Sequence, residues 1–143
     1  MSKSLDGVLT KKANQQETYT NDQVEYLMKC MDPDTGYLYF ANNFAYIQHP
    51  VEGKLLFNSY EYQDRLMYSY HNHRFNINMM PRQTGKTTCA AIYLCWYAMF
   101  NPDQTILIAA HKYTGAQEIM ARIRYVYEPV SYTHLTLPTN VAV

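Results

Sequence analysis

The sequence has no excess of charge of either sign, because 12 Lys and Arg residues are balanced by 12 Asp and Glu residues. Proteins that bind nucleic acid usually carry a basic stripe, so charge gives no support for a DNA contact in this segment. Cysteines are few, and Cys30, Cys89 and Cys95 show neither Cys-x-x-Cys spacing nor a paired pattern. We therefore expect reduced thiols of a cytosolic protein, two of them packed as small apolar groups inside a helix.

Long apolar runs are also missing. The N-terminus has no apolar segment of the kind that a secretory signal contains. The longest uncharged run spans Thr87 to Pro102, and it is shorter than the roughly 20 apolar residues that a membrane span needs. No membrane partner is expected. Apolar residues recur in this run at helical spacing, which predicts a packed core helix from Cys89 to Phe100. These residues are Ala91, Leu94, Cys95 and Ala98.

The most informative stretch that is present is Arg82-Gln83-Thr84-Gly85-Lys86-Thr87-Thr88. It follows an apolar run at residues 75–80 and precedes the core helix, which is the strand, loop and helix order of a phosphate-binding loop. In such a loop, backbone N–H groups surround the phosphates, and Gly85 lets the backbone approach closely. Lys86 would reach the β and γ phosphates, and the Thr87 hydroxyl would ligate Mg²⁺. The alternative is a chance Gly-Lys-Thr in a surface turn.

One departure from the usual loop pattern narrows the choice of family. The first position is Met80 instead of glycine. Met80 to Thr88 resembles the variant loop of tailed-phage terminase large subunits, the DNA-packaging ATPases, which commonly read Arg-Gln-x-Gly-Lys-Thr. The resemblance implies that Arg82 is a cis-acting arginine finger, whose guanidinium offsets charge developing at the γ-phosphate. The alternative for Arg82 is a solvated loop cation. The ATP-binding residues that the resemblance implies in the loop are Arg82, Gln83, Thr84, Gly85, Lys86, Thr87 and Thr88.

A second segment lies about twenty residues upstream of the loop. Leu56 to Met67 looks like the adenine-recognition segment of the same family, whose core is Tyr62-Gln63. A glutamine amide offers both a donor and an acceptor, which suits the N6 and N7 edge of adenine. The adjacent tyrosine can pack on the flat base. The other interpretation is an ordinary amphipathic helix start, with Tyr62 and Leu66 in the core.

A third segment, Gln104 to Lys112, is typical of a buried strand that ends in a polar turn, followed by a helix from about Thr114 to Tyr127. The predicted fold is therefore an incomplete α/β P-loop NTPase, with a RecA- or helicase-like parallel sheet and flanking helices. His111 and Lys112 would lie at the carboxyl end of the strand, where such sheets place ligands. A plain loop without contacts is an equal alternative for both residues.

The chain divides into four predicted segments. A polar flexible tail spans 1–20, a helical lead-in with the adenine-recognition segment spans 21–74, and the N-terminal part of the ATPase core spans 75–129. The final segment, 130–143, breaks the pattern with fourteen uncharged residues. Residues 130–140 look like translated sequencing-adapter DNA fused in frame, so we expect a non-native tail and a product truncated near Pro129. The alternative is a natural short C-terminal strand.

Acidic residues are scarce after Lys86, and they are Asp103, Glu118 and Glu128. A P-loop ATPase also needs a strand ending in acids, usually one for Mg²⁺ and one that activates water. No apolar run here ends in such a pair. In the family those acids lie downstream, followed by a nuclease domain with a metal-binding carboxylate cluster. We therefore expect this fragment to bind nucleotide without hydrolysing it.

The resemblance implies an ATPase motor that drives double-stranded DNA into a procapsid, with an endonuclease in the missing part. Implied partners are the portal and the small terminase subunit, a homo-oligomer is expected at full length, and the location is the cytoplasm of the infected bacterial host. One alternative is a helicase-like P-loop ATPase fragment, although Met80 and Arg82 argue against it. Two others are a small stand-alone nucleotide-binding protein and a non-enzymatic DNA-binding module.

Overall fold

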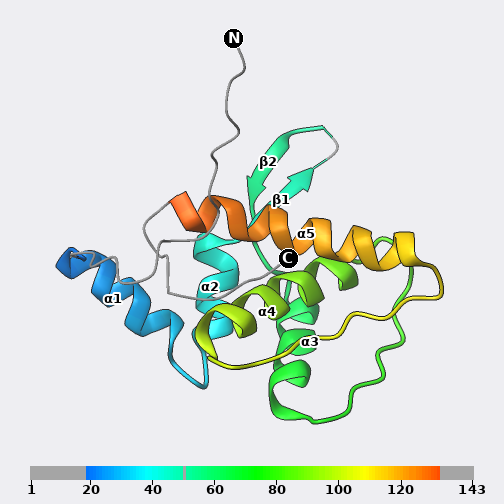
Figure 1. Cartoon of the computed structure of the whole chain (residues 1–143), viewed down its shortest axis with the longest axis horizontal. Coiled ribbons are helices and arrows are strands. Elements are labelled where there is room, and N and C mark those ends of the chain that lie inside the picture. The colour runs from blue at the N-terminus through cyan, green and yellow to red at the C-terminus, as the bar shows by residue number, and fades with distance from the viewer. Residues whose placement is uncertain (1–18, 50, 133–143) are drawn as a thin grey trace.

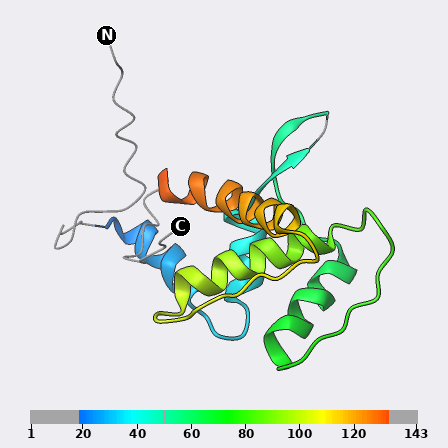
Figure 2. The same cartoon turned by 45° about the vertical axis from the view of Figure 1, so that its right-hand side comes forward.

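A computed structural model describes residues 19–49 and 51–132 as a layered group of helices with one projecting hairpin (Figure 1). In chain order the elements are α1 (Asn21–Cys30), α2 (Gly36–Phe44), β1 (Tyr46–His49), β2 (Gly53–Leu56), α3 (Glu61–Asn72), α4 (Lys86–Phe100) and α5 (Tyr113–Tyr132). Helix α4 lies between α3 and α5 in both views and also packs on α2 (Figures 1 and 2). The helix that follows the Gly-Lys-Thr sequence is therefore the centre of the fold.

The predicted core helix is confirmed and begins three residues earlier than expected, at Lys86. Its buried positions recur every three or four residues, which aligns them on one face of a helix. They are Cys89, Ala91, Ile92, Cys95, Trp96 and Met99. The three cysteines are free and buried, as expected for packed thiols. Burial raises the pKa of Cys89 to about 11 and of Cys95 to about 12. Both thiols therefore stay protonated near neutral pH.

The connection between α1 and α2 is tight because Gly36 lies directly against the end of α1. A Cβ atom on Gly36 would fall 2.3 Å from the carbonyl oxygen of Cys30. Any larger residue would push the two helices apart. Helix α1 itself begins with a capping box, in which the Thr20 hydroxyl and the Gln23 side chain each bind the backbone of the other residue.

The parallel sheet predicted around the loop is not formed in the described part of the chain. Its sheet is an antiparallel hairpin of β1 and β2, with Tyr46 opposite Leu56 and His49 opposite Gly53. Residues 75–80 and 104–110, both predicted as strands, have no regular secondary structure. Ile77 is 96% exposed and Leu107 is 90% exposed, whereas Ile106 and Ile108 are half-buried, so neither segment is buried on both faces. A parallel strand is defined by backbone hydrogen bonds to adjacent strands, and these two segments form no such bonds.

Helix α5 continues past Tyr127, where the sequence predicted its end. It runs to Tyr132 with Pro129 inside it. A proline inside a helix loses one backbone hydrogen bond and crowds the preceding turn. Val126 and Val130, four residues apart on one helix face, are both buried in the core, and Val130 is only 1% exposed. Burying a valine contributes about 1.5–3 kcal/mol, which offsets much of that cost. The segment predicted to be non-native thus begins with a core residue.

Two further predictions concern the ends and the membrane. No helix among the described residues is both long and apolar enough to cross a bilayer. Most of the predicted polar tail (1–20) and residues 133–143 of the predicted non-native segment lie outside the described residues. Those two predictions therefore stay as predictions.

Candidate functional site

The Gly-Lys-Thr loop, defined here as residues 80–88, leads directly into the first turn of α4. Gly85 is the N-cap of the helix and has a left-handed conformation, with φ of 75°. Gln83 also has a positive φ, 65°, whereas Thr84 between them does not. Such alternation turns successive backbone N–H groups toward one side, which makes a concave anion-binding surface. The positive φ values of Gln83 and Gly85 are compatible with an anion-binding loop.

The start of α4 is uncapped. No side chain accepts a hydrogen bond from its first N–H groups, and its first turn contains no acidic residue. The first N–H groups of any helix lack partners within the helix, and the helix dipole adds partial positive charge there. A side chain can satisfy these groups, as Thr20 does for α1, whereas α2 and α4 have no such cap. At α4 they remain available for an anion, which fits a phosphate group.

Lys86 and Thr84 close the loop on itself. The Lys86 Nζ donates a hydrogen bond of 3.1 Å to the Pro81 carbonyl oxygen, and the Thr84 Oγ1 donates one of 3.0 Å to the same oxygen. The ammonium group therefore lies across the loop instead of extending into solvent. The positive charge of Lys86 is thus held at the loop by the Pro81 carbonyl.

The predicted Tyr-Gln segment does meet the loop. The Tyr62 hydroxyl donates to the Thr84 carbonyl oxygen at 3.1 Å, and the Gln63 Nε2 donates to the same oxygen at 3.3 Å. Gln63 is only 5% exposed, although it is polar. Its Oε1 accepts a hydrogen bond of 3.0 Å from the Tyr60 backbone N–H. The structure thus brings together two segments that are more than twenty residues apart in sequence.

The amide of Gln63, predicted to read adenine, is already partly engaged. One of the two Nε2 hydrogens binds Thr84, and one of the two Oε1 lone pairs binds Tyr60. One donor and one acceptor site remain, on a side chain that is largely buried. The Tyr62 ring lies parallel to the Tyr60 ring, with centroids 5.8 Å apart and 6° between the planes. An exposed aromatic ring can stack on a flat base, which is the role predicted for Tyr62.

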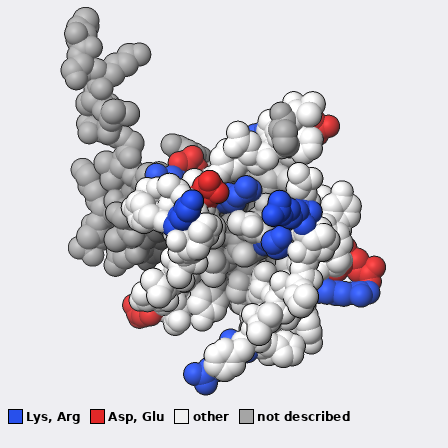
Figure 3. Space-filling view, turned by 90° about the vertical axis from the view of Figure 1, so that its right-hand side faces the viewer, with Lys and Arg blue, Asp and Glu red and all other residues white. Residues whose placement is uncertain are grey.

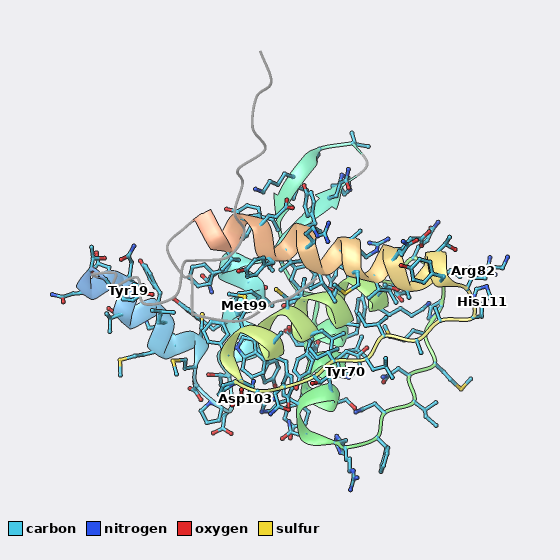
Figure 4. The ribbon with its side chains drawn as sticks, viewed as in Figure 1. Tyr19, Tyr70, Arg82, Met99, Asp103 and His111 are labelled. Carbon is cyan, nitrogen blue, oxygen red and sulfur yellow. The ribbon has the colours of Figure 1, made fainter. Side chains whose placement is uncertain are left out.

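The remaining predicted loop residues lie at the same end of the molecule. Arg82 and Gln83 are exposed, whereas Thr87 and Thr88 are half-buried in the first turn of α4. Arg82 and His111 are drawn at this end, near the start of α5 (Figure 4). Neither Arg82 nor Lys86 forms an ion pair within the described ranges, so both charges are free to meet an anion.

Sequence reasoning missed one residue near the loop. The Arg122 Nη1, from α5, lies 3.5 Å from the Thr88 Oγ1. This contact joins residues 34 positions apart, so nothing in the local sequence marks Arg122. Figure 3 shows the side of the molecule that lies at the right in Figure 1, and several Lys and Arg side chains lie together on this face. The surroundings of the loop are therefore more basic than the neutral net charge suggests.

Asp103, one of the three acids that follow Lys86, lies away from the loop. Asp103 follows the far end of α4, and a helix of 15 residues is about 22 Å long, so Asp103 is well separated from Lys86 (Figure 4). No group of three metal-ligating side chains converges within residues 19–49 and 51–132. His71 and His73 bind within the protein, to the Tyr93 hydroxyl and the Ser69 carbonyl oxygen. The Thr87 hydroxyl is the loop oxygen that the sequence predicts as a Mg²⁺ ligand.

Residues 77–137 match the family model described as terminase large subunit, T4likevirus-type, N-terminal. The match covers the Gly-Lys-Thr loop from position 80, α4 and α5, and it includes positions 130–137 of the segment predicted to be non-native. Tyr62 and Gln63 precede it. The match supports assignment of the chain to one class of protein, the phage DNA-packaging terminases.

Within that class, the match supports identification of the chain as a fragment of a phage terminase large subunit. It thereby confirms the resemblance predicted from residues 80–88.

Proposed function

We propose that the chain carries the ATP-binding loop of a terminase packaging motor. One observation supports this most strongly, namely the uncapped start of α4 behind a left-handed Gly85. An uncapped helix N-terminus with partial positive charge favours phosphate groups. Lys86 and Arg82 add two cations that have no carboxylate partner in the described part of the chain.

Each loop residue has a proposed task. Backbone N–H groups from Gln83 to Thr88 bind the phosphates, with Lys86 moving from the Pro81 carbonyl to a phosphate oxygen. Thr87 ligates Mg²⁺, which supplies charge neutralisation at the phosphates. Arg82 acts in the transition state as the arginine finger. Tyr62 packs on adenine, and Gln63 reads it with the donor and acceptor sites that remain.

The proposed activity of the parent protein needs more chain than these residues provide. A continued chain would add neighbours for residues 75–80 and 104–110, which would then pair as the parallel strands of a P-loop ATPase. It would also add the acids that activate water and the endonuclease domain. ATP hydrolysis by a homo-oligomer would then drive double-stranded DNA through the portal into the procapsid, with the small terminase subunit as partner, in the cytoplasm of the infected bacterium.

Isothermal titration calorimetry of the 143-residue chain with ATP and Mg²⁺ tests the proposal. Lys86→Ala should weaken binding by tenfold or more, because a charge-assisted hydrogen bond contributes about 1.5–3 kcal/mol. Lys54→Ala is the matched control, since it removes an exposed lysine from the hairpin and leaves the loop intact. Equal affinity of the Lys86 variant and the wild type would reject the proposal.

A further inference from the structure

The Thr84 carbonyl oxygen accepts two hydrogen bonds from the same helix. Both donors come from the start of α3, the Tyr62 hydroxyl and the Gln63 Nε2. A carbonyl oxygen has two lone pairs, so this acceptor is fully used. Neither bond involves the bases or phosphates that the two segments are predicted to bind. They tie one peptide of the Gly-Lys-Thr loop to a helix that precedes it in sequence.

The orientation of the Gln63 amide is determined by its surroundings. Its Oε1 faces the Tyr60 backbone N–H, and its Nε2 faces the Thr84 carbonyl. A flipped amide would place a donor against a donor and an acceptor against an acceptor, so only one orientation satisfies both neighbours. The side chain is also buried. Gln63 is therefore a rigid support for the loop.

Gly85 shows how closely the loop lies against this support. A Cβ atom on Gly85 would fall 2.7 Å from the Gln63 Nε2. Real Cβ atoms do not approach a nitrogen so closely, so the absence of a side chain permits the contact. The positive φ of Gly85 favours glycine, and a side chain at this position would displace the Gln63 amide.

Fixing the Thr84 carbonyl also fixes the next N–H group. The peptide between Thr84 and Gly85 is planar and trans, because the chain has no cis peptide among the described residues. Its N–H therefore points opposite to its C=O. With the carbonyl directed at the start of α3, the Gly85 N–H is directed away from α3.

We infer that Tyr62 and Gln63 are positioning residues of the phosphate loop, which preset the Thr84–Gly85 peptide whether or not a base is bound. This inference rests on the proposed function, because it assumes that the loop binds a triphosphate. It differs from adenine reading in one measurable way. A positioning role affects a ligand that has phosphates and no base, whereas adenine reading does not.

The test compares ATP with inorganic tripolyphosphate, each with Mg²⁺, by ³¹P NMR titration of the 143-residue chain. Tyr62→Phe keeps the ring that would pack on adenine and removes only the hydroxyl. Its affinity should fall by about threefold to tenfold for both ligands alike, the range expected for one neutral hydrogen bond. Tyr68→Phe is the matched control on the outer surface of α3 and should bind as the wild type does.

Two further readouts separate positioning from loss of fold. Tyr62 is exposed, so Tyr62→Phe should keep the wild-type melting temperature while the Gly85 amide resonance shifts in a ¹⁵N–¹H spectrum. Gln63→Met, which keeps the length of the side chain and removes both hydrogen bonds, should lose more affinity for tripolyphosphate than Tyr62→Phe does.

The outcomes are distinct. Parallel losses for ATP and tripolyphosphate support positioning. A loss for ATP alone, with tripolyphosphate unchanged, overturns the inference and assigns Tyr62 to the base, while the proposed function stands. Wild-type protein that binds neither ligand rejects the proposed function, and this inference falls with it.

Discussion

The Trp96 indole nitrogen donates a buried hydrogen bond of 2.8 Å to the carbonyl oxygen of Cys30. These residues are 66 positions apart, and the bond joins the middle of α4 to the end of α1. It satisfies a carbonyl at a helix end that water cannot reach. Tyr37 packs edge-on against the same indole, with ring centroids 5.8 Å apart. The helix that presents the Gly-Lys-Thr loop is thus anchored from behind by aromatic contacts and one specific bond.

Trp96→Phe should lower the free energy of unfolding by about 2–4 kcal/mol. The change leaves the Cys30 carbonyl buried without a donor, which costs about 1–3 kcal/mol, and removes part of the indole volume. Urea unfolding followed by circular dichroism measures the loss. Tyr97→Phe is the control, because its hydroxyl binds Gln104 at an exposed site. A loss for Trp96→Phe no larger than that of the control would contradict the anchoring role.

Stability should fall at alkaline pH. Burial raises the pKa of Cys30, Cys95 and Tyr93 to about 12 and that of Cys89 to about 11. Unfolding returns each group to its ordinary, lower pKa, so above about pH 8.5 the unfolded chain starts to lose protons that the folded chain keeps. Loss of these protons stabilises the unfolded state relative to the folded state. The free energy of unfolding therefore declines from about pH 9 toward pH 12.

Urea unfolding at pH 7, 8, 9 and 10 checks this sign. The free energy should be constant over the first two values and smaller at each later one. An increase between pH 8 and pH 10 would contradict burial of these groups. Cys95→Ala removes one of the contributions, so its decline with pH should be shallower than that of the wild type.

The exposed apolar segments should make the fragment associate. Ile77 and Leu107 lie almost fully in solvent, in segments with unpaired backbone groups. Such extended apolar stretches favour pairing with other chains. Ile77→Ser with Leu107→Ser should therefore reduce light scattering at high concentration and change unfolding by less than about 0.5 kcal/mol. Ile92→Ser, at a fully buried position, should instead unfold the chain. Unchanged scattering in the double variant would count against this explanation.

Arg82 is tested in a full-length terminase large subunit that contains this segment. Because an arginine finger acts on charge that develops during phosphoryl transfer, Arg82→Ala should lower kcat by about 100-fold or more. ATP affinity should change by less than about tenfold. Steady-state hydrolysis and separate binding titrations distinguish the two. Equal losses in kcat and in affinity would reduce Arg82 to an ordinary phosphate contact.

Sequence reasoning succeeded where the determinants are local. Helix α4 follows from apolar residues at helical spacing, and the loop follows from Gly85-Lys86-Thr87 placed just before it. The strand predictions for residues 75–80 and 104–110 were wrong. A strand is stabilised by hydrogen bonds to neighbouring strands, and these segments form none in the described part of the chain. The hairpin at Tyr46–Leu56 was missed, although Gly53 with its positive φ marks the turn.

The candidate site was predicted in part for the same reason. Motifs marked the loop residues and the Tyr62-Gln63 pair as parts of one nucleotide site, and the structure brings the pair against the loop. Their roles in binding stay predictions. Which loop atom the pair contacts could not be predicted, because the Thr84 carbonyl is a backbone group that no side-chain pattern reveals. The contact of Arg122 with Thr88 likewise depends on how α5 packs across α4.

The most direct test of the phosphate-loop assignment is an ATP and Mg²⁺ titration of the ¹⁵N-labelled chain. The account predicts that amide resonances from Thr84 to Thr88 shift most, because those N–H groups would bind the phosphates. A pocket between the end of α3, the middle of α4 and residues 105–106 offers a rival location, lined in part by His71, Tyr93 and Tyr97. Shifts confined to that pocket, with the amides of residues 84–88 unchanged, would contradict the assignment.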